Sequence, residues 1–295
     1  MRANLARLCV SLLFGAGICL AQEGPVQSTQ AVAATDHAWL STVQCAGFFS
    51  TEKVPDDLRL VSGEQSEYKV TFTAGDIVYI GKGASQGVKD GDRFAVVRSE
   101  PDPLRIQWFK WQDKLSKAMG DYYRDLGQLT VIKTYPNNAV ARVSFSCEPM
   151  QRGDVLRPYV DRPTGPFHDP AQFDFLAPVS GKPVAMVVQG KSMSQLTGRW
   201  DTVYVNLGTA KGVRVGDYFR VFRYQGTRAE TIPIEKDYQD RLYGFGSNPK
   251  HYSWNDLPRE VLGEGIVLNV SQNAATVLLT TVRQPVYSGD YVELE

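Results

Sequence analysis

One 23-residue segment occurs twice in this chain, and the repetition constrains the fold more than any other feature. "DIVYIGKGASQGVKDGDRFAVVR" occupies residues 76–98, "DTVYVNLGTAKGVRVGDYFRVFR" occupies residues 201–223, and 11 of 23 positions are identical. Chance would give about one or two identities over such a length. The repetition therefore predicts that two parts of the chain fold in the same way.

The shared residues predict strands joined by tight turns. Glycines recur at matching positions, as Gly83 and Gly208, Gly87 and Gly212, and Gly91 and Gly216. Glycine is favoured where a turn needs a positive φ or where another backbone comes close. The flanking runs are rich in β-branched and aromatic residues, which favours strands. Each copy is expected to run strand, glycine-rich connection, Gly-Asp turn, strand.

Weaker matches continue downstream, from Leu126 in the first copy and Leu262 in the second. Each copy then offers five or six short strands, and closing such strands on one another removes their exposed edges. We predict a mainly β fold with two tandem small β-barrel repeats, at residues 55–158 and 181–295. Residues 159–180 between them are proline-rich and predict a semi-rigid linker.

Each copy contains an insertion after the repeated segment, at residues 99–125 in the first and 224–261 in the second. Apolar residues at 108, 111, 115, 119 and 122 have helical spacing, which predicts a helix over about 103–124. The second insertion predicts one helical turn and a loop. Aromatic insertions on a rigid scaffold are common binding sites. The candidate partner contacts are Trp108, Trp111, Tyr122, Tyr243, Phe245, Tyr252 and Trp254.

These aromatic residues have an alternative interpretation. They could close an open barrel end or pack the two repeats together, in which case their substitution would destabilise the fold.

Gly-Asp occurs at four corresponding places. An aspartate after such a glycine can accept hydrogen bonds from nearby backbone N–H groups, which is a structural role at the start of a strand. We expect structural turns rather than metal ligands, and predict no metal site. The turns are Gly91-Asp92, Gly153-Asp154, Gly216-Asp217 and Gly289-Asp290.

The first residues predict export. Residues 1–21 combine Arg2 and Arg7 with an apolar stretch and small residues before Gln22, which is typical of a signal peptide cleaved after Ala21. The alternative is a lipoprotein signal acylated on Cys19. Residues 22–54 are expected to form a partly disordered N-terminal segment. No later segment has the length of a membrane helix, so we expect a periplasmic or secreted protein without a transmembrane segment.

Two cysteines remain after this cleavage, Cys45 and Cys147. In an oxidising compartment such a pair predicts a disulfide, and two buried thiols are the alternative. The remaining chain has 30 Lys and Arg against 32 Asp and Glu. A nucleic-acid binder usually has a basic excess, so we expect no nucleic-acid partner.

No catalytic constellation is recognisable, and no cofactor is predicted. The three histidines lie in unrelated contexts, without metal-ligand spacing. One alternative function is an envelope-polymer hydrolase, for which the only candidate cluster is Asp240, His251, Asp256 and Glu260. A small-ligand carrier that uses a barrel interior is another, but barrels of this size fill with side chains.

The shared pattern G-x₃-G-V-x₂-G-D-x-F-x-V-x-R resembles barrel repeats of secreted bacterial envelope proteins. Among these are the C-terminal domain of flagellar assembly protein T and barrels that accompany peptidoglycan-binding modules. The resemblance covers the two repeats and implies a non-enzymatic role in envelope assemblies. We therefore expect an exported, non-catalytic binding or scaffolding protein that contacts an envelope protein or polymer.

Overall fold

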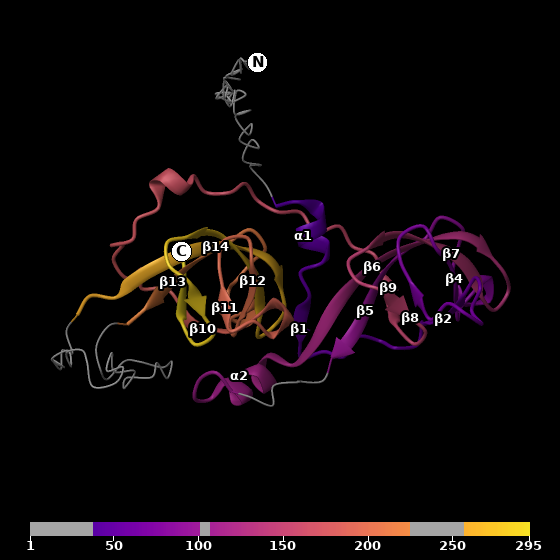
Figure 1. Cartoon of the computed structure of the whole chain (residues 1–295), viewed down its shortest axis with the longest axis horizontal. Helices are drawn as coiled ribbons and strands as arrows, with labels where there is room; N and C mark the ends of the chain where they lie inside the picture. Colours follow the sequence, from indigo (N-terminus) through magenta and orange to yellow (C-terminus); the bar gives the residue numbers. More distant parts are fainter. Residues whose placement is uncertain (1–37, 101–106, 225–256) are drawn as a thin grey trace, which may run out of the picture. The chain divides into compact units, whose positions relative to one another are not determined.

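The structure is a computed structural model that describes residues 38–100, 107–224 and 257–295. Residues Thr35–Glu295 form one compact unit. Its described part is built mainly from strands, so the predicted mainly β class is confirmed (Figure 1). None of the helices in this part of the chain is long and apolar enough to cross a membrane.

The described residues of the N-terminal half form two α-helices, one 3₁₀ helix and nine strands: α1 Leu40–Gln44, β1 Phe48–Ser50, β2 Leu60–Gly63, β3 Thr71–Phe72, β4 Ile77–Ile80, η1 Ala84–Gln86, β5 Arg93–Glu100, α2 Gln112–Met119, β6 Asp121–Thr134, β7 Ala139–Ser146, β8 Met150–Gln151 and β9 Val155–Pro158. The described C-terminal half contains three 3₁₀ helices and eight strands: η2 Pro170–Gln172, β10 Val184–Gly190, η3 Lys191–Met193, β11 Leu196–Thr197, β12 Thr202–Val205, η4 Thr209–Lys211, β13 Tyr218–Arg223, β14 Glu260–Val270, β15 Ala275–Val282, β16 Val286–Tyr287 and β17 Tyr291–Leu294.

The C-terminal half is a closed barrel in the order β10-β12-β15-β14-β13-β17. Antiparallel pairing of β10 with β17 closes it, with Val184 opposite Glu293 and Met186 opposite Tyr291. Side chains fill the interior, and Phe219, Leu262, Val267 and Leu279 are completely buried there. The barrel predicted for residues 181–295 is therefore present, and its core is packed rather than hollow.

The N-terminal half is a seven-stranded sheet in the order β2-β4-β7-β6-β5-β9, with β1 paired to β6. Its two ends are joined by an isolated bridge between Arg59 and Val155 and by a hydrogen bond from the Leu60 N–H to the Asp154 carbonyl (2.9 Å). Among the described residues no continuous strand ladder closes it, so the closed barrel predicted for residues 55–158 is not observed. Pro55, Asp56 and Asp57 precede β2, and these residue types are poor strand formers, so β2 stays shorter than its counterpart β10.

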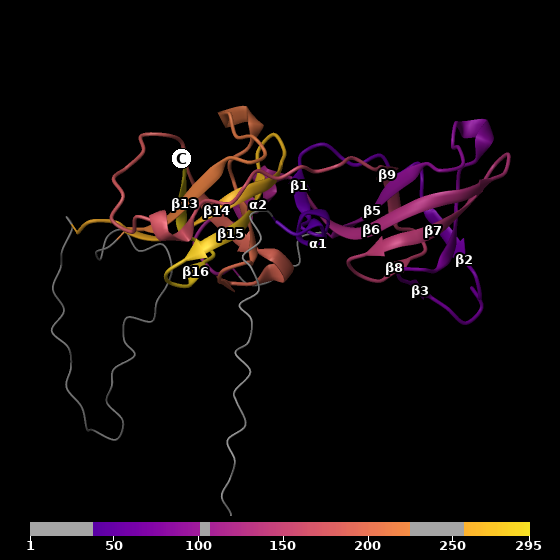
Figure 2. The ribbon, with the colours of Figure 1, turned by 90° about the horizontal axis from the view of Figure 1, so that it is seen from above.

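Both halves connect their strands in the same sequence. β2, β4, β5, β6, β7 and β9 occupy the places in the first sheet that β10, β12, β13, β14, β15 and β17 occupy in the barrel. In Figure 2 the long strand β6 runs beside β5 and β7, as β14 pairs with β13 and β15. We interpret this correspondence as the result of duplication of one module.

The three repeated glycines serve two different needs. A Cβ on Gly208 would lie 2.6 Å from the Gln272 carbonyl oxygen and 2.7 Å from the Ala274 nitrogen, so two backbones pass too close for any side chain. Gly212 and Gly216 instead have φ values of 85° and 91°, in the left-handed region. Gly83, Gly87 and Gly91 repeat this pattern in the first half.

These two roles predict different costs for alanine. Gly208→Ala forces two backbone segments apart and should lower the free energy of unfolding by about 2–3 kcal/mol. Gly212→Ala adds a methyl group to open space and strains only φ, so a loss of about 1 kcal/mol is expected. Urea unfolding of the two variants measures the difference; equal losses would contradict the assignment of separate roles.

The first insertion differs from the helix predicted over 103–124. The helix α2 covers only Gln112–Met119, Trp111 precedes it with a φ of 78°, and Gly120 ends it with a φ of 101°. Strand β5 continues to Glu100 and β6 begins at Asp121, so both ends of the predicted insertion belong to strands. From residue 121 onward the sequence is rich in aromatic and other strand-forming residues. Hydrogen bonding of this strand to β1 and β5 stabilises it more than the helical spacing of the apolar residues would stabilise a helix.

Candidate functional site

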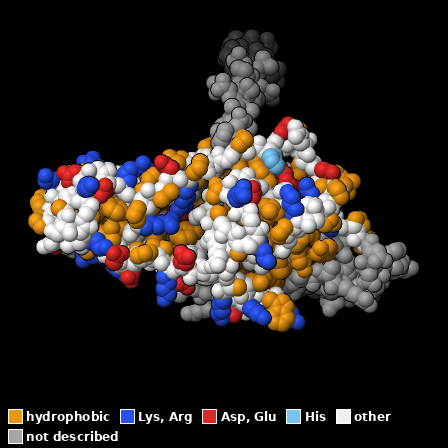
Figure 3. Space-filling view, turned by 180° about the vertical axis from the view of Figure 1, so that it is seen from behind, with side chains coloured by type: hydrophobic (Ala, Val, Ile, Leu, Met, Phe, Trp, Pro, Cys, Tyr) orange, Lys and Arg blue, Asp and Glu red, His pale blue; other side chains and the backbone are white. Residues whose placement is uncertain are grey.

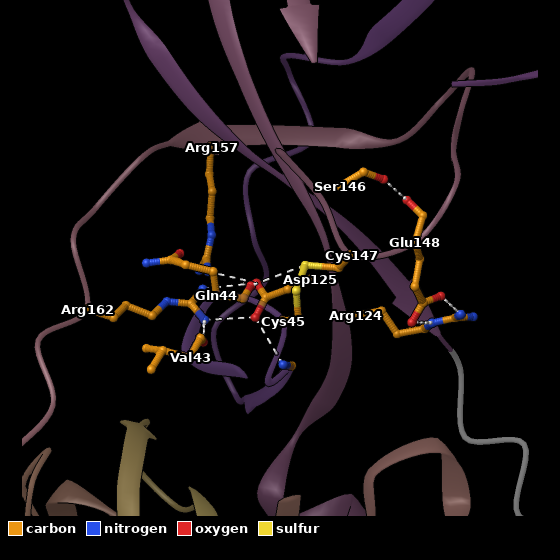
Figure 4. Close-up of a disulfide and its surroundings, with 11 residues drawn as sticks. Val43, Gln44, Cys45, Arg124, Asp125, Ser146, Cys147, Glu148, Arg157 and Arg162 are labelled. Atoms are coloured by element: carbon orange, nitrogen blue, oxygen red, sulfur yellow. Dashed lines mark hydrogen bonds and ion pairs between the residues drawn. A yellow bond between two sulfur atoms is a disulfide. The ribbon is translucent and has the colours of Figure 1, made fainter. Parts of the chain in front are cut away.

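The predicted disulfide between Cys45 and Cys147 is confirmed (Figure 4). Cys45 directly follows the last residue of helix α1. The nearby Val43 and Ala46 pack against the C-terminal barrel, on Tyr218, Ile266, Leu268 and Leu278. Cys147 directly follows β7 of the N-terminal sheet. The disulfide thus ties a segment packed on one half of the molecule to the other half.

Beside the disulfide lies a buried ionic cluster centred on Asp125, whose side chain is 3% exposed. Both carboxylate oxygens of Asp125 accept hydrogen bonds from the Arg162 guanidinium, at 2.8 and 2.9 Å. One oxygen also accepts the Gly47 N–H at 3.0 Å, and Arg157 lies 3.6 Å away. Burial lowers the pKa of Arg157, and the neighbouring Arg162 lowers it further. Asp125 therefore joins β6, the α1–β1 connection and the linker.

The four Gly-Asp pairs share one geometry. Each glycine has a φ between 90° and 106°, and each aspartate accepts a hydrogen bond from the backbone N–H three residues earlier. The corresponding N···O distances are 2.8 Å at Asp92, 2.6 Å at Asp154, 2.8 Å at Asp217 and 2.8 Å at Asp290. These carboxylates hold tight turns before strands.

Two of these aspartates have a second partner that sequence analysis did not identify. Arg98 makes a bidentate ion pair with Asp154 (2.7 and 2.8 Å), and Arg223 makes the same pair with Asp290 (2.7 and 2.7 Å). The available signal was that Arg98 and Arg223 are the last identical residues of the repeated segment. The repeat therefore ends on a structural ion pair, which is a role in folding rather than in ligand binding.

Helix α2 is anchored to the barrel by a residue that sequence analysis missed. Gln112 is completely buried; its side-chain amide donates to the Val188 carbonyl of β10 at 2.8 Å and accepts the Trp108 N–H at 2.7 Å. At the other end of the helix, Asn273 donates to the Ala118 carbonyl at 3.1 Å. Helix α2 is thus held on the barrel at both of its ends.

The candidate aromatic contacts divide into separate environments. Trp111 is 60% exposed at the start of α2, with the Lys110 ammonium 4.8 Å from its ring centroid. Tyr122 is only 6% exposed and donates or accepts a 2.9 Å hydrogen bond with Tyr204, so it is not accessible to a partner. Trp108 is partly buried, and its indole N–H has no hydrogen-bond partner in the part of the chain that the structure describes.

The aromatic candidates of the second insertion, Tyr243, Phe245, Tyr252 and Trp254, lie outside the described residues. The same holds for Asp240, His251 and Asp256 of the hydrolase alternative. Its fourth member, Glu260, begins β14 and lies 3.6 Å from the Arg283 guanidinium.

His168, Glu264 and Glu295 form a group of titratable side chains. Sequence analysis did not predict that these residues lie together. Their potential ligand atoms lie within 4.8 Å of one another. Burial raises the pKa of Glu264, and the nearby Glu295 adds to this effect. Arg220 already pairs with Glu295 at 2.9 Å, and the His168 ring stacks on Tyr218. These contacts account for the group as part of the packing of the linker on the barrel.

Comparison of the sequence with models of known protein families gives no match, and comparison with curated proteins gives no significant match.

Proposed function

We propose that the protein is an exported, non-catalytic binding or scaffolding component of a bacterial cell envelope, and that it contacts a partner through Trp111. The observation that supports this proposal is an exposed tryptophan next to a residue that anchors the helix to the barrel. Trp111 is 60% exposed, whereas Gln112 beside it is fully buried and hydrogen-bonded to β10. Large aromatic side chains at such fixed positions contribute strongly to protein interfaces.

Export is supported by the disulfide and by the leader-like residues 1–21. Disulfides persist in oxidising compartments and are rare in reducing ones. On the face drawn in Figure 3, Lys and Arg side chains are scattered together with Asp, Glu and hydrophobic side chains. A surface of mixed charge is suited to a protein partner. A nucleic-acid partner would be expected to bind a basic stripe.

The contact is tested by site-specific photo-crosslinking in intact cells, with p-benzoylphenylalanine in place of Trp111. The matched control carries the same group in place of Tyr68, which is 88% exposed in the N-terminal half. We expect a crosslinked envelope component from position 111 and not from position 68. No adduct at 111, or the same adducts at both positions, would refute the contact.

Trp111→Ala should separate binding from stability. Because Trp111 is exposed, its removal should change the free energy of unfolding by only about 0.5 kcal/mol while abolishing recovery of the crosslinked partner by the purified protein. Thermal unfolding checks the first part. A large loss of stability would instead favour the packing interpretation of the insertion.

A further inference from the structure

A second site is indicated by a tryptophan that occupies a glycine position. The repeated segments begin at Asp76 and Asp201, and both aspartates close the same turn by accepting the backbone N–H of the residue three positions earlier, at 2.8 and 2.7 Å. In the first half the residue before the aspartate is Gly75, with a φ of 93°. In the second half it is Trp200, with a φ of 72°.

This conformation is unfavourable for tryptophan, because a side chain in the left-handed region meets its own backbone. The five other turns of this type in the described chain have glycine at this place, at residues 75, 91, 153, 216 and 289. Strained residues of this kind are retained mainly at functional sites. The strain at Trp200 therefore requires an explanation other than the turn itself.

The indole of Trp200 is partly exposed to solvent. It is 39% exposed, packs 5.4 Å from the Phe167 ring and 6.2 Å from the Trp39 ring, and carries the Arg199 guanidinium 4.6 Å from its centroid. Trp39 is itself 54% exposed. The result is a supported aromatic surface rather than a core side chain.

This surface borders a groove of about 520 Å³ between α1 and the start of β12, which we call the Trp200 groove. Residues that carry hydroxyl groups line it on both sides, Ser41 and Thr42 on α1 and Ser194 and Thr202 on the barrel, and the Ser194 hydroxyl also donates to the Leu196 carbonyl. A flat apolar face next to several hydroxyl groups suits a ligand that is itself apolar on one face and hydroxylated at its edge.

The groove also contains a lysine, Lys191, and an aspartate, Asp201. The Lys191 ammonium forms no hydrogen bond or contact ion pair with any residue that the structure describes, although its side chain lines the groove and is partly buried. The Asp125 carboxylate attracts it only through a longer-range electrostatic interaction. Burial lowers the pKa of this ammonium group. The next two residues, Ser192 and Met193, have φ values of 57° and 61°, so the loop that carries Lys191 is strained as well. Two of the five non-glycine residues with positive φ in the described chain, Ser192 and Trp200, thus line this groove.

We propose that the Trp200 groove binds an acidic saccharide, with a pyranose ring against the Trp200 indole and its carboxylate beside Lys191. A pyranose ring presents C–H groups on its faces and hydroxyl groups around its rim, which matches the aromatic surface and the hydroxyl-lined wall. The Lys191 ammonium selects a sugar that carries a carboxylate over a neutral one. This site is separate from the contact of Trp111 and does not depend on it.

The test is isothermal titration of the purified full chain with acidic oligosaccharides built from galacturonate, glucuronate or N-acetylmuramate. Neutral cello-oligosaccharides and an oligo-glutamate peptide of similar length serve as comparison ligands. We expect binding of at least one acidic oligosaccharide, weaker binding of the neutral one and none of the peptide. Failure of all three acidic sugars, or preference for the peptide, would overturn the proposal.

Two substitutions locate the binding. Trp200→Gly restores the residue that the turn favours, so the thermal midpoint should be retained or raised while affinity for the acidic sugar falls about tenfold or more. Lys191→Gln should remove the preference for the acidic over the neutral sugar. Trp111→Ala is the matched control and should bind the sugar like the unmodified protein. Unchanged sugar affinity in Trp200→Gly would exclude this groove, and loss of binding in Trp111→Ala would move the site to α2.

Discussion

Reduction of the Cys45–Cys147 disulfide is expected to lower the free energy of unfolding by about 4–5 kcal/mol, the largest effect that we predict. The two cysteines are 102 residues apart, and in the chain-entropy model a closed loop of this size restricts the unfolded chain by about that amount. The disulfide also retains the α1–β1 segment, which packs on the barrel through Val43 and Ala46 and pairs with β6. Chemical unfolding with and without reductant measures the loss.

The double variant Cys45→Ser with Cys147→Ser provides the control for the reductant itself. It should unfold like the reduced protein and should show no further response to reductant. A midpoint equal to that of the oxidised protein would show that packing alone holds the α1–β1 segment in place.

Asp125→Ala is the second large effect, with an expected loss of about 3–5 kcal/mol. The carboxylate of Asp125 is 3% exposed and neutralises Arg162, which is itself only 12% exposed, and Arg157 lies nearby. Removing the carboxylate leaves two partly buried arginines without this counterion and leaves the Gly47 N–H without its acceptor. Because Arg162 belongs to the linker, the docking of the linker should weaken too.

Asp113→Ala is the matched control. Asp113 also pairs with a cation, Lys117 at 2.8 Å, but the pair is an exposed contact within helix α2. Its loss should change the free energy of unfolding by only about 0.5 kcal/mol. Urea unfolding of both variants gives the comparison, and similar losses would contradict the role assigned to the buried cluster.

Much of the fold follows from local patterns in the sequence. The glycines at 83, 87 and 91 and their counterparts predict turns, because each position has either no room for a side chain or a positive φ. Both conditions are set mainly by a few nearby residues. The disulfide could be predicted because only two cysteines follow the leader-like segment. The length of α2 could not, since the strand that begins at Asp121 is stabilised by partners β1 and β5 that are distant in sequence.

The candidate sites were harder to predict for the same reason. Nothing in the local sequence distinguishes exposed Trp111 from buried Tyr122, because burial of Tyr122 depends on Tyr204 and Phe49. Gln112 and Asp125 likewise acquire their roles from residues far along the chain. Trp200 is the exception, since alignment of the two repeats places it opposite Gly75 and so marks it as unusual.

Export of the protein and oxidation of its cysteine pair are tested together by one measurement. Protein recovered from the envelope fraction of its own cells, alkylated without reductant, is analysed by intact mass spectrometry. We predict a chain that begins at Gln22, carries no alkyl group on Cys45 or Cys147, and is alkylated at both only after reduction. A full-length chain recovered from the cytoplasm with both thiols alkylated before reduction would contradict the account.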